Sequence, residues 1–519
     1  MLYRKPLRVV AGLLAIGSLL ALNACRDVQD PLEAQEKRAI GSGRLSTDFM
    51  FYALKDNNEL LLLNSQNPSV AVRTITLTGV QGNERLVSID FRPATGQLYG
   101  VSNNSRLYMI NVVNGRAQAL GAGPFSPTIN GDVVAFDFNP TVDRVRLVTS
   151  SGQNMRLNPE TGTVIGIDGA INGVPNVVVT GIAYTNNRAG VTSTVLYDID
   201  PVTDKLYIQN PPNNGTLVEV GALGIDIAGV GSFDITPNGD AVALLINNFK
   251  QGFYQINLAT GRAEFLGDMS NFSSLVGMAV PTEAVAYTVD NNNRLMIFNP
   301  FNPAPIMKSI TGLQPDEVLF GIDFRPANGQ LYAIGSTSRL YTINTSNGMA
   351  TMVGSGPFSP ALTSREIGID FNPTVDRIRV VGNMGQNLRL NPNDGTVAAV
   401  DGNLNPMPVN VTAAAYTNNF AGATTTVLYD IDTRLTNARL FRQNPPNTGG
   451  LELVGSLNAF IEGGNGFDIG GASNVGYALL RSGGITRVFT IDLMSGVATG
   501  GAALPGNPTV HGFTIGLGF

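Results

Sequence analysis

The chain has 519 residues, of which 43% are apolar and 14% charged, and its formal net charge at pH 7 is −6. This apolar content excludes an intrinsically disordered chain, and an acidic chain without a basic run excludes nucleic acid as a partner. With one histidine, one cysteine and no tryptophan, His/Cys zinc sites and histidine-based acid–base catalysis are strongly disfavoured.

The N-terminus carries an export signal. Basic residues at 4, 5 and 8 precede an apolar stretch over 9–22, and Leu22-Asn23-Ala24-Cys25 follows. This pattern resembles bacterial lipoprotein signals, although an ordinary signal peptide with a chance cysteine would look similar. The resemblance implies a signal peptide over 1–24, a lipidated Cys25 and a polar tether over 25–47. Because Arg26 follows the cysteine, it also implies an outer-membrane lipoprotein of the cell envelope, on the periplasmic or the surface face.

The remainder of the chain is a duplication. The run SIDFRPATGQLYGVS at 88–102 returns as GIDFRPANGQLYAIG at 321–335, and DFNPTVDRVRLV at 137–148 returns as DFNPTVDRIRVV at 370–381. The run VLYDID occurs at 195–200 and again at 427–432. Near-identity at this length predicts two domains of the same fold, over 48–281 and 284–519.

Within each half, a shorter repeat is marked by turns of the form Ile/Leu-Asn/Asp-x-x-x-Gly, such as Leu157-Asn158 to Gly162. A short Asn or Asp side chain bonds the amides just ahead, and the glycine takes a positive φ. Short alternating apolar runs flank each turn and helical periodicity is absent, which predicts antiparallel four-stranded units and an all-β chain. We therefore expect a β-propeller with two tandem five-bladed rings, the alternative being one ten-bladed ring. In each half, the last segment is expected to pair with the first and so to close the ring.

The runs DFRPxxGQLY, DFNPTVDRxR, GQNxRLNPxxG and YDID resemble the bacterial domain of unknown function 4394, here present twice. The resemblance implies an exported, propeller-like fold. It implies no activity and no catalytic residues.

One aspartate recurs in the innermost predicted strands. These residues are Asp90, Asp137 and Asp234 in the first half, and Asp323, Asp370 and Asp468 in the second. Converging carboxylates could hold Ca²⁺ or raise one another's pKa for acid–base work. Alternatively, each aspartate caps the turn into its own following loop, and a regular repeat favours this structural interpretation.

Alternate arginines form a second candidate cluster, with Arg146 and Arg156 in the first half and Arg379 and Arg389 in the second. They could clamp a carboxylate, a sulfate or a sugar acid. The alternative is that they pair with the recurring aspartates between neighbouring blades. The lone His511, whose first-half counterpart is Val276, is expected to be a surface or turn residue.

These patterns favour a non-enzymatic binding module, without a cofactor, for a protein, peptide or glycan. The module is expected to be monomeric and to contact the membrane through its lipid anchor. The alternative function is a Ca²⁺-dependent hydrolase or lyase that uses the channel carboxylates. In that case odd residues should gather in the channel of one half, whereas a binding module should keep both halves alike.

Overall fold

The computed structural model describes residue 45 and residues 48–228, 232–272, 274–434, 437–462 and 466–519. In these ranges the regular elements are forty β-strands and two 3-10 turns, η1 (Pro212–Asn214) and η2 (Pro446–Thr448). These described residues form one compact unit. A helix long and apolar enough to cross a membrane is not found in the described part. The predicted signal peptide over 1–24, Cys25 and nearly all of the tether over 25–47 lie outside the described residues.

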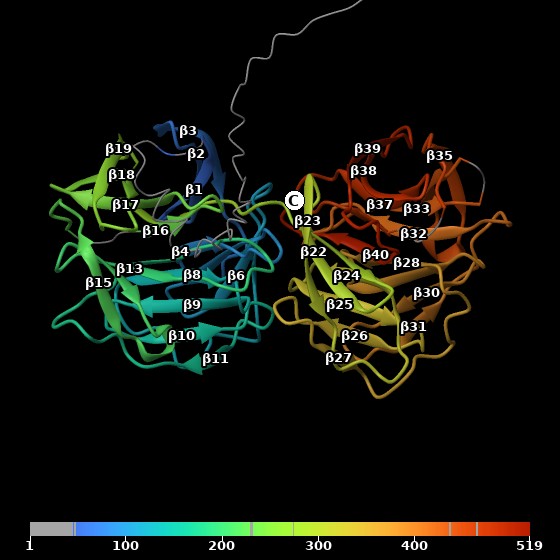
Figure 1. Ribbon diagram of the computed structural model, residues 1–519, viewed down its shortest axis with the longest axis horizontal. Helices are drawn as coiled ribbons and strands as arrows, with labels where there is room; N and C mark the ends of the chain where they lie inside the picture. The colour runs from blue at the N-terminus through green and yellow to red at the C-terminus, as the bar shows by residue number, and fades with distance from the viewer. Residues whose placement is uncertain (1–44, 46–47, 229–231, 273, 435–436, 463–465) are drawn as a thin grey trace, which may run out of the picture. The chain divides into compact units, whose positions relative to one another are not determined.

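The strands form ten four-stranded antiparallel sheets, so the chain is all-β and propeller-like as predicted (Figure 1). Five sheets come from the first half of the sequence, coloured blue to green, and five from the second, coloured yellow to red. The first-half sheets, each in spatial order, are β20 (Leu275–Ala279), β1 (Met50–Lys55), β2 (Glu59–Asn64) and β3 (Asn67–Thr76); β4 (Leu86–Phe91), β5 (Leu98–Ser102), β6 (Leu107–Ile110) and β7 (Ala117–Ala119); β8 (Val134–Asn139), β9 (Arg144–Thr149), β10 (Asn154–Leu157) and β11 (Val164–Ile167); β12 (Gly181–Tyr184), β13 (Leu196–Asp200), β14 (Lys205–Gln209) and β15 (Leu217–Ala222); and β16 (Ser232–Ile235), β17 (Ala241–Asn247), β18 (Lys250–Ile256) and β19 (Ala263–Asp268).

The second half repeats this arrangement. Its sheets, in the same order, are β40 (Val510–Ile515), β21 (Ala286–Asp290), β22 (Arg294–Asn299) and β23 (Asn302–Ser309); β24 (Leu319–Arg325), β25 (Gln330–Gly335), β26 (Leu340–Ile343) and β27 (Ala350–Val353); β28 (Ile367–Asn372), β29 (Arg377–Gly382), β30 (Asn387–Leu390) and β31 (Val397–Val400); β32 (Val411–Tyr416), β33 (Leu428–Asp432), β34 (Arg439–Gln443) and β35 (Leu451–Ser456); and β36 (Gly466–Ile469), β37 (Gly476–Ser482), β38 (Ile485–Ile491) and β39 (Ala498–Ala503).

Burial falls from the first strand of a sheet to the last, and this explains the sequence pattern. In β8 all residues but the last are buried, so the strand is a continuous apolar run interrupted only by Asp137. In β11 alternate side chains are exposed, with Ile165 at 46% and Ile167 at 70%. A strand with one free face shows alternation, whereas a strand packed on both faces does not.

In each half the last strand pairs with the first, as the sequence predicts. The strand β1 pairs with β20, so that Ala53 lies opposite Met278. The strand β21 pairs with β40 in the same way. The two ends of each half therefore share one sheet, which leaves neither end strand as an unpaired edge.

The first strands of the sheets contact one another in a closed order. In the first half, β4 contacts β8, β8 contacts β12, β12 contacts β16, β16 contacts β20, and β20 contacts β4 again. In the second half, the same order runs through β24, β28, β32, β36 and β40. The recurring aspartates of each half all lie in these first strands.

The capped turns form as predicted. The Asn158 side chain accepts the amide of Glu160 at 2.8 Å, and the amide of Gly162 donates to the Asn158 carbonyl at 2.9 Å. Gly162 has a φ of 67°, a value that side chains with a Cβ disfavour. Each such turn joins the third and fourth strands of a sheet.

Candidate functional site: two carboxylate clusters

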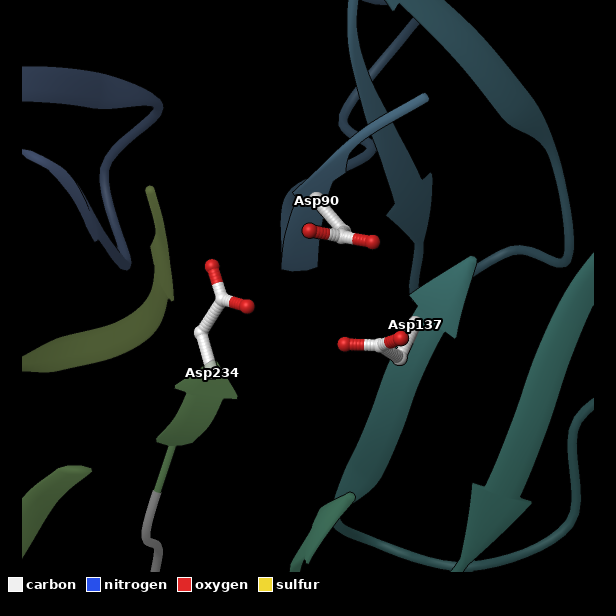
Figure 2. A group of neighbouring side chains, drawn as sticks. All are labelled: Asp90, Asp137 and Asp234. Carbon is white, nitrogen blue, oxygen red and sulfur yellow. The ribbon is translucent and has the colours of Figure 1, made fainter. Parts of the chain in front are cut away.

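Three of the recurring aspartates meet in each half. We call Asp90, Asp137 and Asp234 the first triad, and Asp323, Asp370 and Asp468 the second triad. Within each triad, one carboxylate oxygen per residue lies within 4.8 Å of the other two. Figure 2 shows the side chains of the first triad turned toward one another from three different strands. All six aspartates are at most 2% exposed.

In the first triad, backbone amides of the neighbouring sheet hold the carboxylates. Asp90 accepts a hydrogen bond of 2.8 Å from the backbone amide of Phe138, and Asp137 accepts one of 3.2 Å from that of Tyr184. Asp234 accepts the amide of Val280 at 2.6 Å, and that of its own neighbour Ile235, also at 2.6 Å. Oδ1 of Asp90 has no hydrogen-bond partner among the described residues.

These bonds revise the structural interpretation of the aspartates. The sequence suggests that each aspartate caps its own following loop. Instead, Asp90 in β4 bonds an amide of β8, and Asp137 in β8 bonds an amide of β12. Because the partner lies some 50 residues along the chain, local sequence gives no sign of it. The carboxylates thus connect neighbouring inner strands.

The second triad has the same frame and two additional polar groups, which are the Thr514 hydroxyl and the side-chain amide of Asn419, 3.5 Å from Oδ1 of Asp468. Asp323 accepts the amide of Phe371 at 2.7 Å, and Asp468 accepts that of Ile515 at 2.8 Å. The Thr514 hydroxyl lies 3.0 Å from Oδ1 of Asp323 and 2.8 Å from Oδ2 of Asp468. Neither carboxylate oxygen of Asp370 has a hydrogen-bond partner in the described part of the chain.

Burial raises the pKa of every aspartate in the triads. Burial raises the pKa of Asp234 to about 7, although the hydrogen bonds from the amides of Val280 and Ile235 act to lower it. Burial likewise raises the pKa of Asp468 to about 6. The pKa of Asp90 is raised well above its usual range, first by burial and then by the nearby Asp234 carboxylate. The pKa values of Asp137, Asp323 and Asp370 are raised by burial and by neighbouring carboxylates in the same way. Each triad therefore needs protons or a cation to offset its charge.

The arginines of the cluster form ion pairs and hydrogen bonds with residues other than those that the sequence predicts. Arg146, which is 2% exposed, donates from Nη1 to Asp168 at 2.5 Å and from Nη2 to Asn213 at 2.7 Å. Arg156 holds both oxygens of Asp168, each at 2.8 Å. These bonds lower the pKa of Asp168 although burial acts to raise it.

The second half repeats this cluster with Arg379, Arg389 and Asp401. The arginines join neighbouring sheets, because Arg379 in β29 also donates to Asn447, beyond β34. Their acidic partner is a loop residue and not one of the recurring aspartates, so the predicted pairing is wrong in its partner. The engaged guanidinium groups also argue against a clamp for an external anion.

Two further buried acids lie in the YDID runs, which the sequence analysis used only as markers of the repeat. Asp198 in β13 and Asp430 in β33 are fully buried, and their carboxylate oxygens have no hydrogen-bond partners among the described residues. Burial raises the pKa of Asp430 to about 8, although the Arg379 guanidinium acts to lower it. Both strands read LYDID and contain a second buried aspartate, Asp200 or Asp432, and this duplicated pair of acids in a buried strand is the signal that could have identified them.

His511 lies apart from both triads at the beginning of β40. Its Nε2 lies 2.5 Å from Oδ1 of Asn291, and burial lowers its pKa against the nearby Glu366 and Asp290 carboxylates. The ring packs at 6.2 Å from that of Phe320. His511 is thus a half-buried residue of strand β40 and not the surface or turn residue that the sequence predicts.

Comparisons with known proteins agree with the duplication. A model of the Domain of unknown function (DUF4394) matches residues 59–279 and again residues 294–514. No curated protein matches the chain.

Two solved structures are among those similar to the chain. The extracellular domain of the putative one component system BT4673 from B. thetaiotaomicron is 13% identical, with 87% of this chain and 58% of that chain covered and a TM-score of 0.25. The extracellular domain of the putative hybrid two component system BT4673 from the same organism is 10% identical, with 88% and 65% covered and a TM-score of 0.24. The match spans less than two thirds of either structure. Because the DUF4394 model covers most of the sequence in two tandem copies, the chain belongs to the DUF4394 family.

Proposed function

We propose that the protein is an exported, lipid-anchored and monomeric binding module with two five-bladed propellers, over 48–281 and 284–519. The closed order of contacts from β4 through β20 and back to β4 supports two rings over one ring of ten blades. Lipidation of Cys25, the outer membrane and the monomeric state are parts of the proposal that rest on the sequence. The module acts through its surface and not through its channels.

The burial of the triads is the observation that carries this proposal. All six carboxylates are at most 2% exposed, so a substrate has no access to these convergent acids in either half. The frame of the triads also recurs in both halves, as expected for a structural element. The surfaces that remain for recognition are the turns and the outermost strands of the sheets.

The outermost strands favour a protein or peptide ligand over a glycan. Each is the last strand of its sheet, and several carry exposed aliphatic side chains, with Ile167 at 70% on β11 and Val400 at 64% on β31. The chain has no tryptophan, and no described tyrosine is exposed, so the amphipathic rings that stack on sugars are missing from the described surface. An extended peptide can add to such an edge through backbone hydrogen bonds.

The full-length protein should select peptides from a displayed random library. Saturable binding should disappear in an Ile167→Lys, Val400→Lys double variant, because a lysine on an edge strand opposes pairing. It should persist in Val113→Lys, a change at an exposed turn position. Peptide binding that persists in the double variant as well as in Val113→Lys would contradict the edge-strand site. Saturable glycan binding without peptide binding would contradict the ligand class.

A Ca²⁺-dependent hydrolase or lyase is the second candidate. The unpartnered oxygens of Asp90 and Asp370 favour it, since a cation would satisfy them. The burial of both residues opposes it. Turnover of ester, lactone or glycoside substrates that requires Ca²⁺ and is lost in Asp90→Asn would establish this function in place of a binding module.

A further inference from the structure

The two triads differ in the side chains around them, and the exchange of Ala279 in the first half for Thr514 in the second assigns them different contents. We propose that the first triad binds one divalent cation of the Ca²⁺ type, whereas the second triad is closed by a proton and the Thr514 hydroxyl and binds none. This inference does not depend on the ligand of the binding module.

The first triad has the donor set of a Ca²⁺ site. Three carboxylate oxygens lie within 4.8 Å of one another, and Ca²⁺ takes oxygen ligands at about 2.3–2.6 Å, so one ion can contact all three. Oδ1 of Asp90 is buried without a partner, and Figure 2 shows this carboxylate turned toward Asp137 and Asp234. Burying a polar atom without a hydrogen-bond partner is unfavourable, so the structure favours a ligand at this oxygen.

Each aspartate of the first triad also accepts a backbone amide, from Phe138, Tyr184 or Val280. Such bonds favour the charged form of a carboxylate. Three carboxylates held in this way in the interior repel one another unless a cation lies among them. A divalent ion offsets most of their charge without requiring a proton on any of them.

The second triad contains its own counter-group. The Thr514 hydroxyl has one proton but lies within hydrogen-bond distance of oxygens from both Asp323 and Asp468. It can donate to one carboxylate only, so the other contact is a hydrogen bond only if that carboxyl group donates its own proton.

The matching residue in the first half is Ala279, which precedes Val280 as Thr514 precedes Ile515. The amides of Val280 and Ile515 make the same bond to the last aspartate of their triads, so the two frames align residue by residue. Ala279 offers no hydroxyl. This one position therefore distinguishes a triad that lacks a counter-group from one that contains it.

Calcium stoichiometry tests the inference. The full-length protein is treated with a chelator, dialysed and titrated with CaCl₂ in a calorimeter, and the bound metal is counted by mass spectrometry. We expect one Ca²⁺ per chain in the wild type, none in Asp234→Asn or Ala279→Thr, and two in Thr514→Ala. Ala279→Ser serves as a smaller hydroxyl variant, and far-UV circular dichroism checks that each variant is folded.

Each other outcome overturns the inference. A wild-type protein that binds no Ca²⁺ holds protons in both triads, and one that binds two has equivalent triads. Persistence of the single site in folded Ala279→Thr and Ala279→Ser would show that the hydroxyl does not decide occupancy. A Thr514→Ala variant that still binds one ion would show that Thr514 is not what closes the second triad. Binding that persists in Asp234→Asn would place the ion elsewhere.

Discussion

Arg146 donates a hydrogen bond of 2.5 Å to Asp168, and the two side chains are only 2% and 6% exposed. Arg146 also donates to the hydroxyl of Tyr184 in β12 and to Asn213, which follow it in the next sheet of the same half. A buried guanidinium with all these acceptors fixes the distance between two sheets more rigidly than apolar packing alone.

Arg146→Met should therefore lower the free energy of unfolding by about 3 kcal/mol or more, because it leaves buried acceptors without a donor. The matched change Arg156→Met should cost about 1 kcal/mol or less, since the Arg156 side chain is one-third exposed and water screens its pair with Asp168. Urea unfolding followed by far-UV circular dichroism suits a chain without tryptophan. Equal losses in the two variants would contradict the buried network.

Asp430→Asn should stabilise the protein at neutral pH. The pKa of Asp430 is about 8 in the folded chain against an ordinary value of 3.8, so folding favours the protonated form. The contribution of this group to stability is complete below its unfolded pKa and is lost as the pH rises through 8. The variant should gain up to about 4 kcal/mol at pH 7, because asparagine carries no charge to bury.

The measurement is the urea midpoint between pH 4 and pH 8. The slope of stability with pH should flatten in Asp430→Asn and stay unchanged in the exposed control Asp132→Asn. An unaltered slope in Asp430→Asn would mean that Asp430 is charged and has a partner in the folded chain.

Gly368→Ala should destabilise the second half by about 1–3 kcal/mol through overpacking. A Cβ at Gly368 would lie 2.5 Å from the backbone nitrogen of Ala414, which cannot swing away as a side chain could. At Gly382 the nearest atoms would be 3.6 Å away, so Gly382→Ala is a control expected to fold normally. Thermal unfolding separates the two. Similar midpoints in both variants would show that β28 and β32 can move apart at no cost.

Removal of residues 509–519 should abolish the soluble monomer. The deletion takes away β40 and leaves β21, which is buried along its whole length, as an unpaired edge. A synthetic peptide of residues 509–519, added during refolding, should restore the monomer peak in size-exclusion chromatography, whereas a scrambled peptide should not. A stable monomer without β40 would contradict the closing role of this strand.

The architecture could be predicted because it repeats. Turns from Asn or Asp to Gly, such as Asn158 to Gly162, recur in three units of each half, and the duplication shows that the pattern is not chance. The pairing of β1 with β20 followed from a first-strand segment found at the end of each half. These features are local, or are read by comparing one half with the other.

The chemistry at the centre was harder to predict because its partners are distant in sequence. Nothing near Arg146 identifies Asp168 as its acid, and nothing near Asp90 identifies the amide of Phe138. The exchange of Ala279 for Thr514 is visible when the halves are aligned. Its meaning depends on two carboxylates that only the fold brings within reach of the hydroxyl.

The pairing of β1 with β20 also makes the beginning and end of the first half adjacent. When the two ends of a unit lie on neighbouring strands of one sheet, a short linker can join them into a circular chain. The chain termini can then be moved to another loop by circular permutation. The permuted chain would form the same strands in the same spatial order around the same three aspartates.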